Sequence, residues 1–382
     1  MNARNIVLLA VVAAAAIAGY ALLRSEPAAF GSLKDYAVVQ SLDSPDLTLV
    51  NLDDNELAET VTLPVQPDQI VLSAVLDRII YTSRAGRSVS VYDIGAQADE
   101  AVISLPFAPD TIVLAPDGLT VAAAGAEAGS VALIALDDRV LLGTIADISD
   151  PLDMTFSDSS EFLFVSDSAA GELAVINAAT ARRIDPVPLS LGGVESPAEL
   201  SAMTRTPNGL YGLVVDSLAG RMSVINFRNW QEVASLRLGS TPSRPYGTAD
   251  GQYMLIANTG DSTVSVLSTE FFEVAATLPG VSSVTGISTG YFETLAFVVS
   301  DNEDRAVLID LEGMELAGEV ALPGTPGVPV TDAEGRKIYV TLRDRNELVV
   351  FDTASREVVS TVKDVGNRPW KVALAQTNNY CH

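Results

Sequence analysis

The sequence is poor in the residue types that carry most enzyme and metal chemistry. It contains one cysteine and one histidine, adjacent to each other at the end of the chain as Cys381 and His382. A single cysteine excludes a disulfide bond within the chain, although it leaves a disulfide between two copies open. A metal site built on these two residues would need carboxylates as its other ligands. We therefore expect no metal site and no cofactor.

Catalytic sequence motifs are missing as well. The chain has no Gly-x-Ser-x-Gly elbow, no phosphate-binding glycine loop and no His-Glu-x-x-His pattern. The last five residues match the second half of a c-type haem attachment motif, Cys-x-x-Cys-His, but Asn378 stands where the first cysteine would be. These absences favour a non-catalytic protein and leave an enzymatic role open.

Basic residues are few. The chain has 23 Lys and Arg residues against 49 Asp and Glu residues, and its formal net charge is −26. Nucleic acids and anionic membranes bind basic surfaces, so this charge argues against both as partners. An acidic surface keeps a protein soluble and favours a basic partner.

The N-terminal segment is the one long uncharged apolar stretch. Arg4 is followed by residues 6–23, which carry no charge and consist mostly of Ala, Val, Leu and Ile. This length suits either a signal peptide, with a small-residue cleavage site at Ala16-Ile17-Ala18, or a membrane anchor. We expect residues 1–24 to place the protein in the periplasm or elsewhere outside the cytoplasm, cleaved or tethered to the inner membrane. A linker, residues 25–35, follows.

The rest of the chain, residues 36–382, is organised by a repeat. Anchor positions lie 40 to 46 residues apart and precede a short apolar run, and all but one of them are proline. The anchors are Pro67, Pro109, Pro151, Pro197, Pro242, Ser282, Pro326 and Pro369.

Each repeat contains four short runs rich in Val, Ile and Leu, separated by turn residues, which predicts four strands. In the last whole repeat these runs begin at Pro326, Ile338, Leu348 and Val358. A period of this length with four strands is typical of β-propellers, because one such sheet cannot bury its own faces. The sequence predicts an all-β, eight-bladed propeller, with seven blades as the alternative if the Ser282 repeat is misread.

The two ends of the repeat region complement each other. Runs at 36–39, 47–51 and 57–63 look like second, third and fourth strands without a first, whereas 369–374 looks like a first strand with nothing after it. We expect these fragments to pair as one shared blade, which closes the ring and leaves no open strand edge.

These repeats resemble the YVTN-type propeller repeats of exported bacterial proteins. The resemblance rests on Tyr339-Val340-Thr341, on the proline anchors and on third strands such as Met222-Ser223-Val224-Ile225-Asn226. More distantly, an exported eight-bladed propeller is similar to the haem-binding propeller of dissimilatory nitrite reductases and to quinoprotein-associated propellers. The haem sites of the former rely on histidine, and no histidine precedes the last residue here.

Arginine and aromatic residues lie in loops, and at the starts of first strands, that the propeller topology brings to one face. Loops between second and third strands open on the same face as the loops that enter first strands. Arg is suited to carboxylate or phosphate recognition, and Trp or Tyr offers a stacking plane. The predicted ligand-binding residues are Arg84, Arg244, Tyr246, Arg343, Arg368 and Trp370.

The alternative for these arginines is ion pairing at the surface. The same face carries Asp43, Asp46, Asp301, Asp304, Asp344 and Glu347.

The sequence favours an exported, non-catalytic binding or scaffold protein that engages a protein partner or a small acidic ligand. The resemblances imply a second possibility, a subunit or assembly factor of a periplasmic redox enzyme. A lactonase-type hydrolase ranks third.

Overall fold

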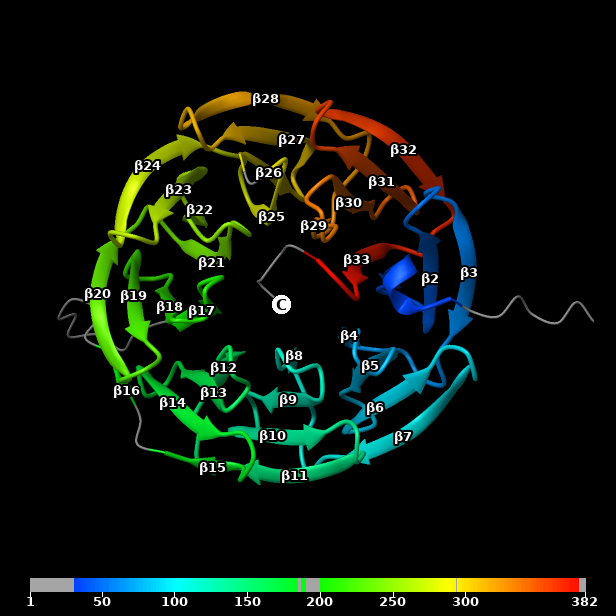
Figure 1. Ribbon diagram of the computed structural model, residues 1–382, viewed down its shortest axis with the longest axis vertical. Helices are drawn as coiled ribbons and strands as arrows, with labels where there is room; N and C mark the ends of the chain where they lie inside the picture. Colours follow the sequence, from blue (N-terminus) through cyan, green and yellow to red (C-terminus); the bar gives the residue numbers. More distant parts are fainter. Residues whose placement is uncertain (1–30, 185–186, 190–199, 293, 378–382) are drawn as a thin grey trace, which may run out of the picture.

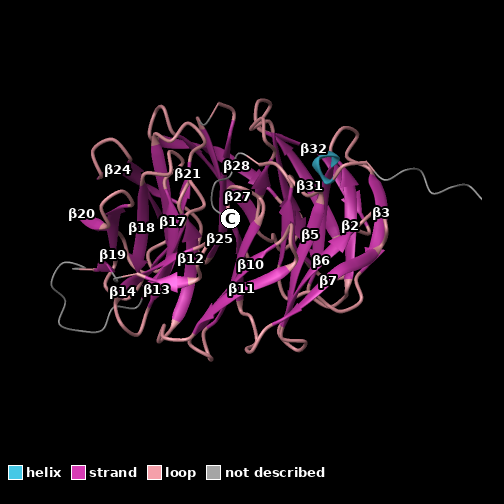
Figure 2. Ribbon diagram, turned by 60° about the horizontal axis from the view of Figure 1, so that its bottom comes forward, coloured by secondary structure: helices cyan, strands magenta, loops and turns pink. Residues whose placement is uncertain are grey.

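The protein is a ring of eight small antiparallel sheets around one axis (Figure 1). The computed structural model describes residues 31–184, 187–189, 200–292 and 294–377. Almost all regular structure in these residues is β-strand, with one short 3-10 helix visible in the tilted view (Figure 2). The prediction of an eight-bladed propeller is confirmed, and the Ser282 repeat is a regular blade.

Several features named from the sequence lie outside the described residues: the N-terminal segment 1–24, residues 25–30 of the linker, the anchor Pro197, and Asn378, Cys381 and His382 at the end of the chain. Within the described part of the chain, no helix has the length and apolar character that a membrane crossing requires.

The first half of the ring contains the closing blade and blades 1 to 3. The closing blade has the strands β1 (Tyr36–Ser41), β2 (Asp46–Asn51), β3 (Leu57–Thr62) and β33 (Pro369–Leu374). Blade 1 has β4 (Ile70–Ser73), β5 (Arg78–Ser83), β6 (Ser88–Asp93) and β7 (Ala98–Ser104). Blade 2 has β8 (Thr111–Leu114), β9 (Thr120–Gly125), β10 (Ser130–Ala135) and β11 (Val140–Ile145). Blade 3 has β12 (Pro151–Phe156), β13 (Phe162–Asp167), β14 (Glu172–Asn177) and the short β15 (Arg182–Arg183) and β16 (Val187–Pro188).

The second half contains blades 4 to 7. Blade 4 has β17 (Leu200–Arg205), β18 (Tyr211–Asp216), β19 (Arg221–Asn226) and β20 (Gln231–Arg237). Blade 5 has β21 (Pro242–Gly247), β22 (Tyr253–Asn258), β23 (Thr263–Ser268) and β24 (Glu273–Pro279). Blade 6 has β25 (Val284–Gly290), β26 (Leu295–Ser300), β27 (Glu303–Asp310) and β28 (Glu315–Ala321). Blade 7 has β29 (Val330–Thr331), β30 (Lys337–Leu342), β31 (Glu347–Asp352) and β32 (Glu357–Lys363).

The closing blade joins the two ends of the chain as predicted. Its strand order is β3-β2-β1-β33, and β1 pairs with β33 in antiparallel register from Ala37 opposite Leu374 to Gln40 opposite Lys371. The ring is therefore held shut by hydrogen bonds between strands that are more than 300 residues apart in sequence.

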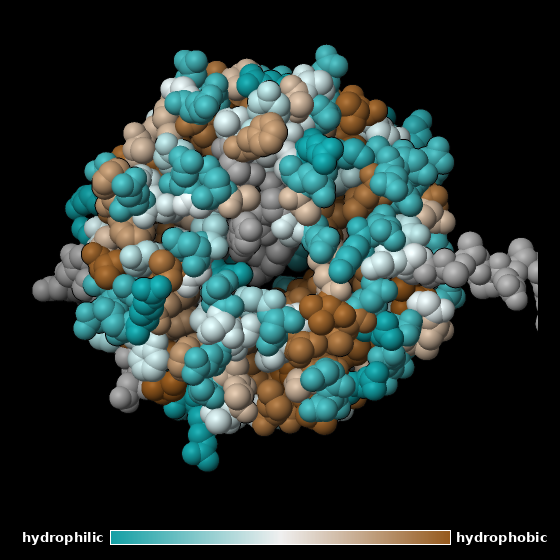
Figure 3. Space-filling model, in the orientation of Figure 1, coloured by the Kyte–Doolittle hydropathy of each residue, from teal (hydrophilic) through white to brown (hydrophobic). Residues whose placement is uncertain are grey.

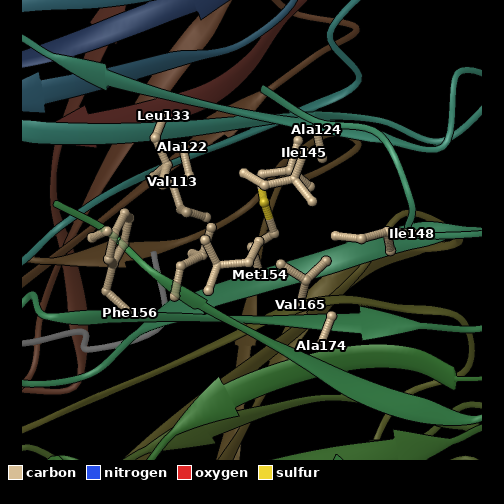
Figure 4. Packing of buried hydrophobic residues seen from close by; sticks show 14 of the residues in the cluster. Val113, Ala122, Ala124, Leu133, Ile145, Ile148, Met154, Phe156, Val165 and Ala174 are labelled. Atoms are coloured by element: carbon tan, nitrogen blue, oxygen red, sulfur yellow. The ribbon is translucent and has the colours of Figure 1, made fainter. Parts of the chain in front are cut away.

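The core consists of apolar clusters between neighbouring blades. The middle strands of each blade are buried on both faces, which explains why their sequences show continuous apolar runs. Between blades 2 and 3, for example, Val113 and Leu133 pack with Met154, Phe156 and Val165 (Figure 4). A single blade cannot form such a cluster, so each blade depends on both of its neighbours.

The inner strand of blade 7 corrects a detail of the prediction. The run that begins at Pro326 was expected to form it, but β29 contains only Val330 and Thr331. Pro326 and Pro329 have no N–H to donate to a ladder. A side chain on Gly327 would collide with the carbonyl oxygen of Trp370, so this segment lies tightly against β33.

The end of the predicted linker belongs to the folded ring. Leu33 is buried, and its N–H donates to Asp77 Oδ1 at 2.7 Å on blade 1. Ser32 Oγ donates to the same oxygen at 2.9 Å. These contacts fix the point at which the chain enters the propeller.

Deleting residues 369–382 tests the closure. The deletion removes Val372 and Leu374 from the cluster with blade 7 and Ala373 from the cluster with blade 1, and it leaves β1 as an open edge. We expect a large loss of thermal stability and aggregation, measured by thermal denaturation and light scattering. Deleting residues 1–30, which end before the Leu33 contacts, is the control. Equal melting temperatures of the two truncated chains would contradict the closure.

Candidate functional site

Two cavities follow one another along the ring axis. The first, called here the proximal cavity, has a volume of about 760 Å³ and lies where the inner strands begin. The second, the distal cavity, has a volume of about 520 Å³ and lies where the inner strands end. Ile112, Lys371 and Val372 line both cavities, so they lie where the two meet. The surface is hollowed near the middle of the ring (Figure 3).

One repeat position supplies much of the proximal wall. The residue two places after the anchor proline lines this cavity in six repeats: Gln69, Thr111, Asp153, Arg244, Val328 and Lys371. In β12, β21 and β33, an extra residue interrupts the pairing with the neighbouring strand beside this position. Such β-bulges re-aim side chains. The repeat thus presents two cations and one carboxylate to the axis.

Asp153 and Arg244 form an ion pair across blade 4. Arg244 Nη2 contacts Asp153 Oδ2, and the same oxygen accepts the N–H of Met203 at 2.8 Å. Asp153 Oδ1 accepts the N–H of Met154 at 2.9 Å. Since Asp153 is only 3% exposed, its carboxylate is a buried charge held by one guanidinium and two backbone donors.

Lys371 is the second cation of the cavity, and it has no such compensation. Among the residues that the structure describes, its Nζ makes neither an ion pair nor a hydrogen bond. Burial lowers the pKa of Lys371, and the positive charge of Arg244 lowers it further. Of the two cations on this wall, only Arg244 is paired with a carboxylate in the described part of the chain.

Trp370 is in contact with both the proximal cavity and Arg343. Its side chain lines the proximal cavity, and the guanidinium carbon of Arg343 lies 4.7 Å from the centre of its ring. This is a cation–π contact. Arg343 also pairs with Asp301 at 3.5 Å, and its Nε is buried without a hydrogen-bond acceptor in the described part of the chain.

Two of the predicted arginines are ion-paired at the surface. Arg84 contacts Asp110, and Arg368 Nη1 lies 2.9 Å from Asp43 Oδ2. Their side chains are 49% and 57% exposed, and neither is among the residues that line the two cavities. Arg84 and Arg368 thus form surface ion pairs, which was the alternative to ligand binding.

The six predicted residues therefore fall into two groups, one at the proximal cavity and one at the surface. Arg244, Tyr246 and Trp370 line the proximal cavity, and Arg343 lies against Trp370. Lys371 and Asp153 were not among the predicted residues, which were all arginine or aromatic. The available signal was the repeat itself, in which both residues are equivalent to Arg244. In the ranges that the structure describes, no group of three or more His, Cys, Asp and Glu residues could hold a metal ion.

Arginine substitutions distinguish the contribution of the buried ion pair to stability from that of the surface pairs. Arg244→Met leaves the Asp153 carboxylate buried without its cation, and we expect the free energy of unfolding to fall by about 3 kcal/mol. Arg84→Met and Arg368→Met remove exposed pairs and should change it by less than about 1 kcal/mol. Urea denaturation measures all three variants. A loss in Arg244→Met no larger than in the other two would contradict the buried pair.

Replacing Lys371 by Met removes a buried charge while keeping an unbranched side chain. We expect the free energy of unfolding to rise at neutral pH by about 1–3 kcal/mol, because the amine is no longer transferred out of water on folding. The pKa of Lys371 is lowered from 10.5 in the folded protein, so between the two values the unfolded chain binds more protons. The wild type therefore gains stability relative to Lys371→Met as pH rises toward 10.5.

Paired denaturation curves at neutral and alkaline pH measure this difference. Lys363→Met, on the exposed outer strand β32, is the control and should show no such trend. A stability gap between wild type and Lys371→Met that stays constant with pH would contradict the burial of an uncompensated amine.

Comparison with solved structures supports the architecture. The chain is similar to dihydro-heme d1 dehydrogenase NirN in complex with DHE, with 20% identity, a TM-score of 0.75 and coverage of 93% of this chain and 78% of that chain. It is also similar to hydrazine synthase of Kuenenia stuttgartiensis (16% identity, TM-score 0.55, coverage of 75% and 96%). A functionally unknown protein of Desulfotomaculum acetoxidans matches with 13% identity, a TM-score of 0.56 and coverage of 75% and 95%. At these identities the likeness concerns the fold alone.

No curated protein matches the sequence. Residues 98–378, well over half of the chain, match the sequence profile of YNCE-like beta-propellers. The chain belongs to the YNCE-like beta-propeller family.

Proposed function

We propose that the protein is a non-catalytic binding protein whose proximal cavity holds a small anionic ligand. The observation that carries the proposal is the pair of cations, Arg244 and Lys371, at equivalent repeat positions on the wall of one cavity. The same wall carries Asp68 and Asp153, and Asp153 offsets the charge of Arg244. Within the described residues, Lys371 is therefore the cation of this wall that has no carboxylate partner.

The charge balance of the cavity supports an anion as the ligand. Asp153 is already held by Arg244 and two backbone N–H groups. Asp68, the other carboxylate on the wall, is exposed and accepts the N–H of Arg84 at 2.6 Å. Lys371 has neither carboxylate as a partner, which leaves its charge for a bound anion.

The chemistry of the wall also indicates the form of the anion. Arg recognises planar carboxylates through paired N–H donors, and Trp370 and Tyr246 add aromatic surface. A small carboxylate with a flat or apolar body fits this combination, as does an acidic side chain of a protein partner. The cavity is within the size range usual for small-molecule sites.

A redox role is the second candidate. It is supported by the similarity of 93% of the chain to dihydro-heme d1 dehydrogenase NirN and by the likeness to hydrazine synthase. In that case the chain would be a subunit or assembly factor of an exported redox enzyme. Absorption beyond the protein band in protein purified from its native source would favour this candidate. The narrower YVTN-type assignment and export through residues 1–24 also stay predictions.

Ligand-induced stabilisation tests the anion proposal. Acetate, succinate, benzoate and lactate are titrated while the melting temperature is recorded. A ligand at 100 times its Kd stabilises the folded state by about 2.7 kcal/mol. We expect stabilisation by at least one of these acids in the wild type and in the control Lys363→Met, and none in Lys371→Met. Equal stabilisation of both variants would place the binding outside the proximal cavity and overturn the proposal.

A further inference from the structure

Lys371 lines both axial cavities, and its amine has no partner among the described residues. It lies where the two axial cavities meet, so a molecule in either cavity can reach it. No acceptor within the described residues engages its Nζ. Strand pairing on β33, with Gln40 opposite, holds its backbone in place. A lysine that only stabilised the fold would be expected to use its three donors.

Lys337 shows what a structural lysine looks like in this protein. It is also partly buried, near the closing blade, and its Nζ donates to the carbonyl oxygen of Leu52 at 2.7 Å and to Asn55 Oδ1 at 3.3 Å. Lys371 has no equivalent contacts. The two lysines therefore differ in their partners, although both residues are partly exposed.

Lysine is also an unusual cation in this chain, which makes its presence at position 371 informative. The chain contains four lysines, Lys34, Lys337, Lys363 and Lys371, against nineteen arginines. Every ion pair that the described residues form uses arginine as its cation. Arginine stays protonated in proteins, whereas a buried lysine loses its proton readily and becomes a nucleophile. A primary amine at the axis offers chemistry that the arginines cannot provide.

We propose that Lys371 forms a reversible imine with the carbonyl carbon of a small 2-oxo acid whose carboxylate lies at Arg244. The proposal rests on the proposed function, because the oxo acid is the anion of the same cavity. Burial and the neighbouring charge of Arg244 lower the pKa of Lys371, which raises the fraction of neutral amine.

The step is balanced without any other reactant. The lone pair of the neutral Nζ attacks the carbonyl carbon, and the C–O π bond breaks to give a carbinolamine. The oxygen then leaves as water with the two protons of the amine, and a C=N bond forms. No oxidant or reductant takes part, and addition of water reverses the reaction.

The distal cavity provides room for the rest of such an acid. Its wall is mixed: the apolar part includes Ile70, Leu72, Leu114 and Leu374, and the polar part includes Thr155, Arg205, Gln376 and Thr377. With the carboxylate at Arg244 and the carbonyl carbon at Lys371, the remaining substituent of the acid points toward the apolar part of this wall. We therefore expect a 2-oxo acid with an apolar substituent to be favoured over a short one.

Reductive trapping tests the proposal. The full chain is incubated with pyruvate or phenylpyruvate and then with sodium cyanoborohydride, digested, and analysed by mass spectrometry. We expect one modified peptide, containing Lys371, with a mass gain equal to that of the acid less one oxygen atom. Phenylpyruvate should give more adduct than pyruvate. The other three lysines serve as internal controls, and equal labelling of all four would overturn the proposal.

Lys371→Arg separates imine formation from anion binding. It keeps the positive charge but cannot form the imine, so it should still be stabilised by phenyllactate, the 2-hydroxy counterpart, and should give no adduct. If the wild type binds phenyllactate and phenylpyruvate equally and no adduct forms, the imine is wrong and the anion site stands. If neither acid binds the wild type and no adduct forms, both the anion site and the imine are wrong.

Discussion

Everything in this structure depends on the pairing of β1 with β33. The inter-blade clusters bury apolar faces only if each blade has a neighbour on both sides, and the two ends of the chain supply the last neighbour. Backbone hydrogen bonds at this junction replace a covalent closure, which the single cysteine of the chain could not provide. The ring is thus a cooperative unit: loss of one strand exposes two interfaces at once.

Ring closure also creates the candidate site. The proximal wall is built from one residue of each of several blades, so no blade carries a site on its own. Asp153, Arg244 and Lys371 come from blade 3, blade 5 and the closing blade, and the buried Asp153 holds Arg244 across the intervening blade 4. The propeller therefore converts a linear repeat into a circle in which equivalent positions face one another. Divergence at a single repeat position is enough to change the chemistry of the axis.

The sequence predicted most of the fold and part of the site. Strand lengths, turn residues and proline anchors are local features, and the missing first strand at one end matched the extra strand at the other. Local patterns could not predict which carboxylate meets which arginine, because Arg84 meets Asp110 and Arg368 meets Asp43 only through the spacing of loops in three dimensions. The short β29 differed from its pattern because two prolines limit its ladder.

The position of Lys371 in β33 has a consequence for biosynthesis. Of the strands that the structure describes, β33 is the last to be synthesised, and its partner β1 is the first. A nascent chain with seven complete blades would still lack both the closed ring and the amine of the axial cavity. The capacity to capture a ligand would therefore appear only in a chain whose fold is finished, so binding would report completed folding.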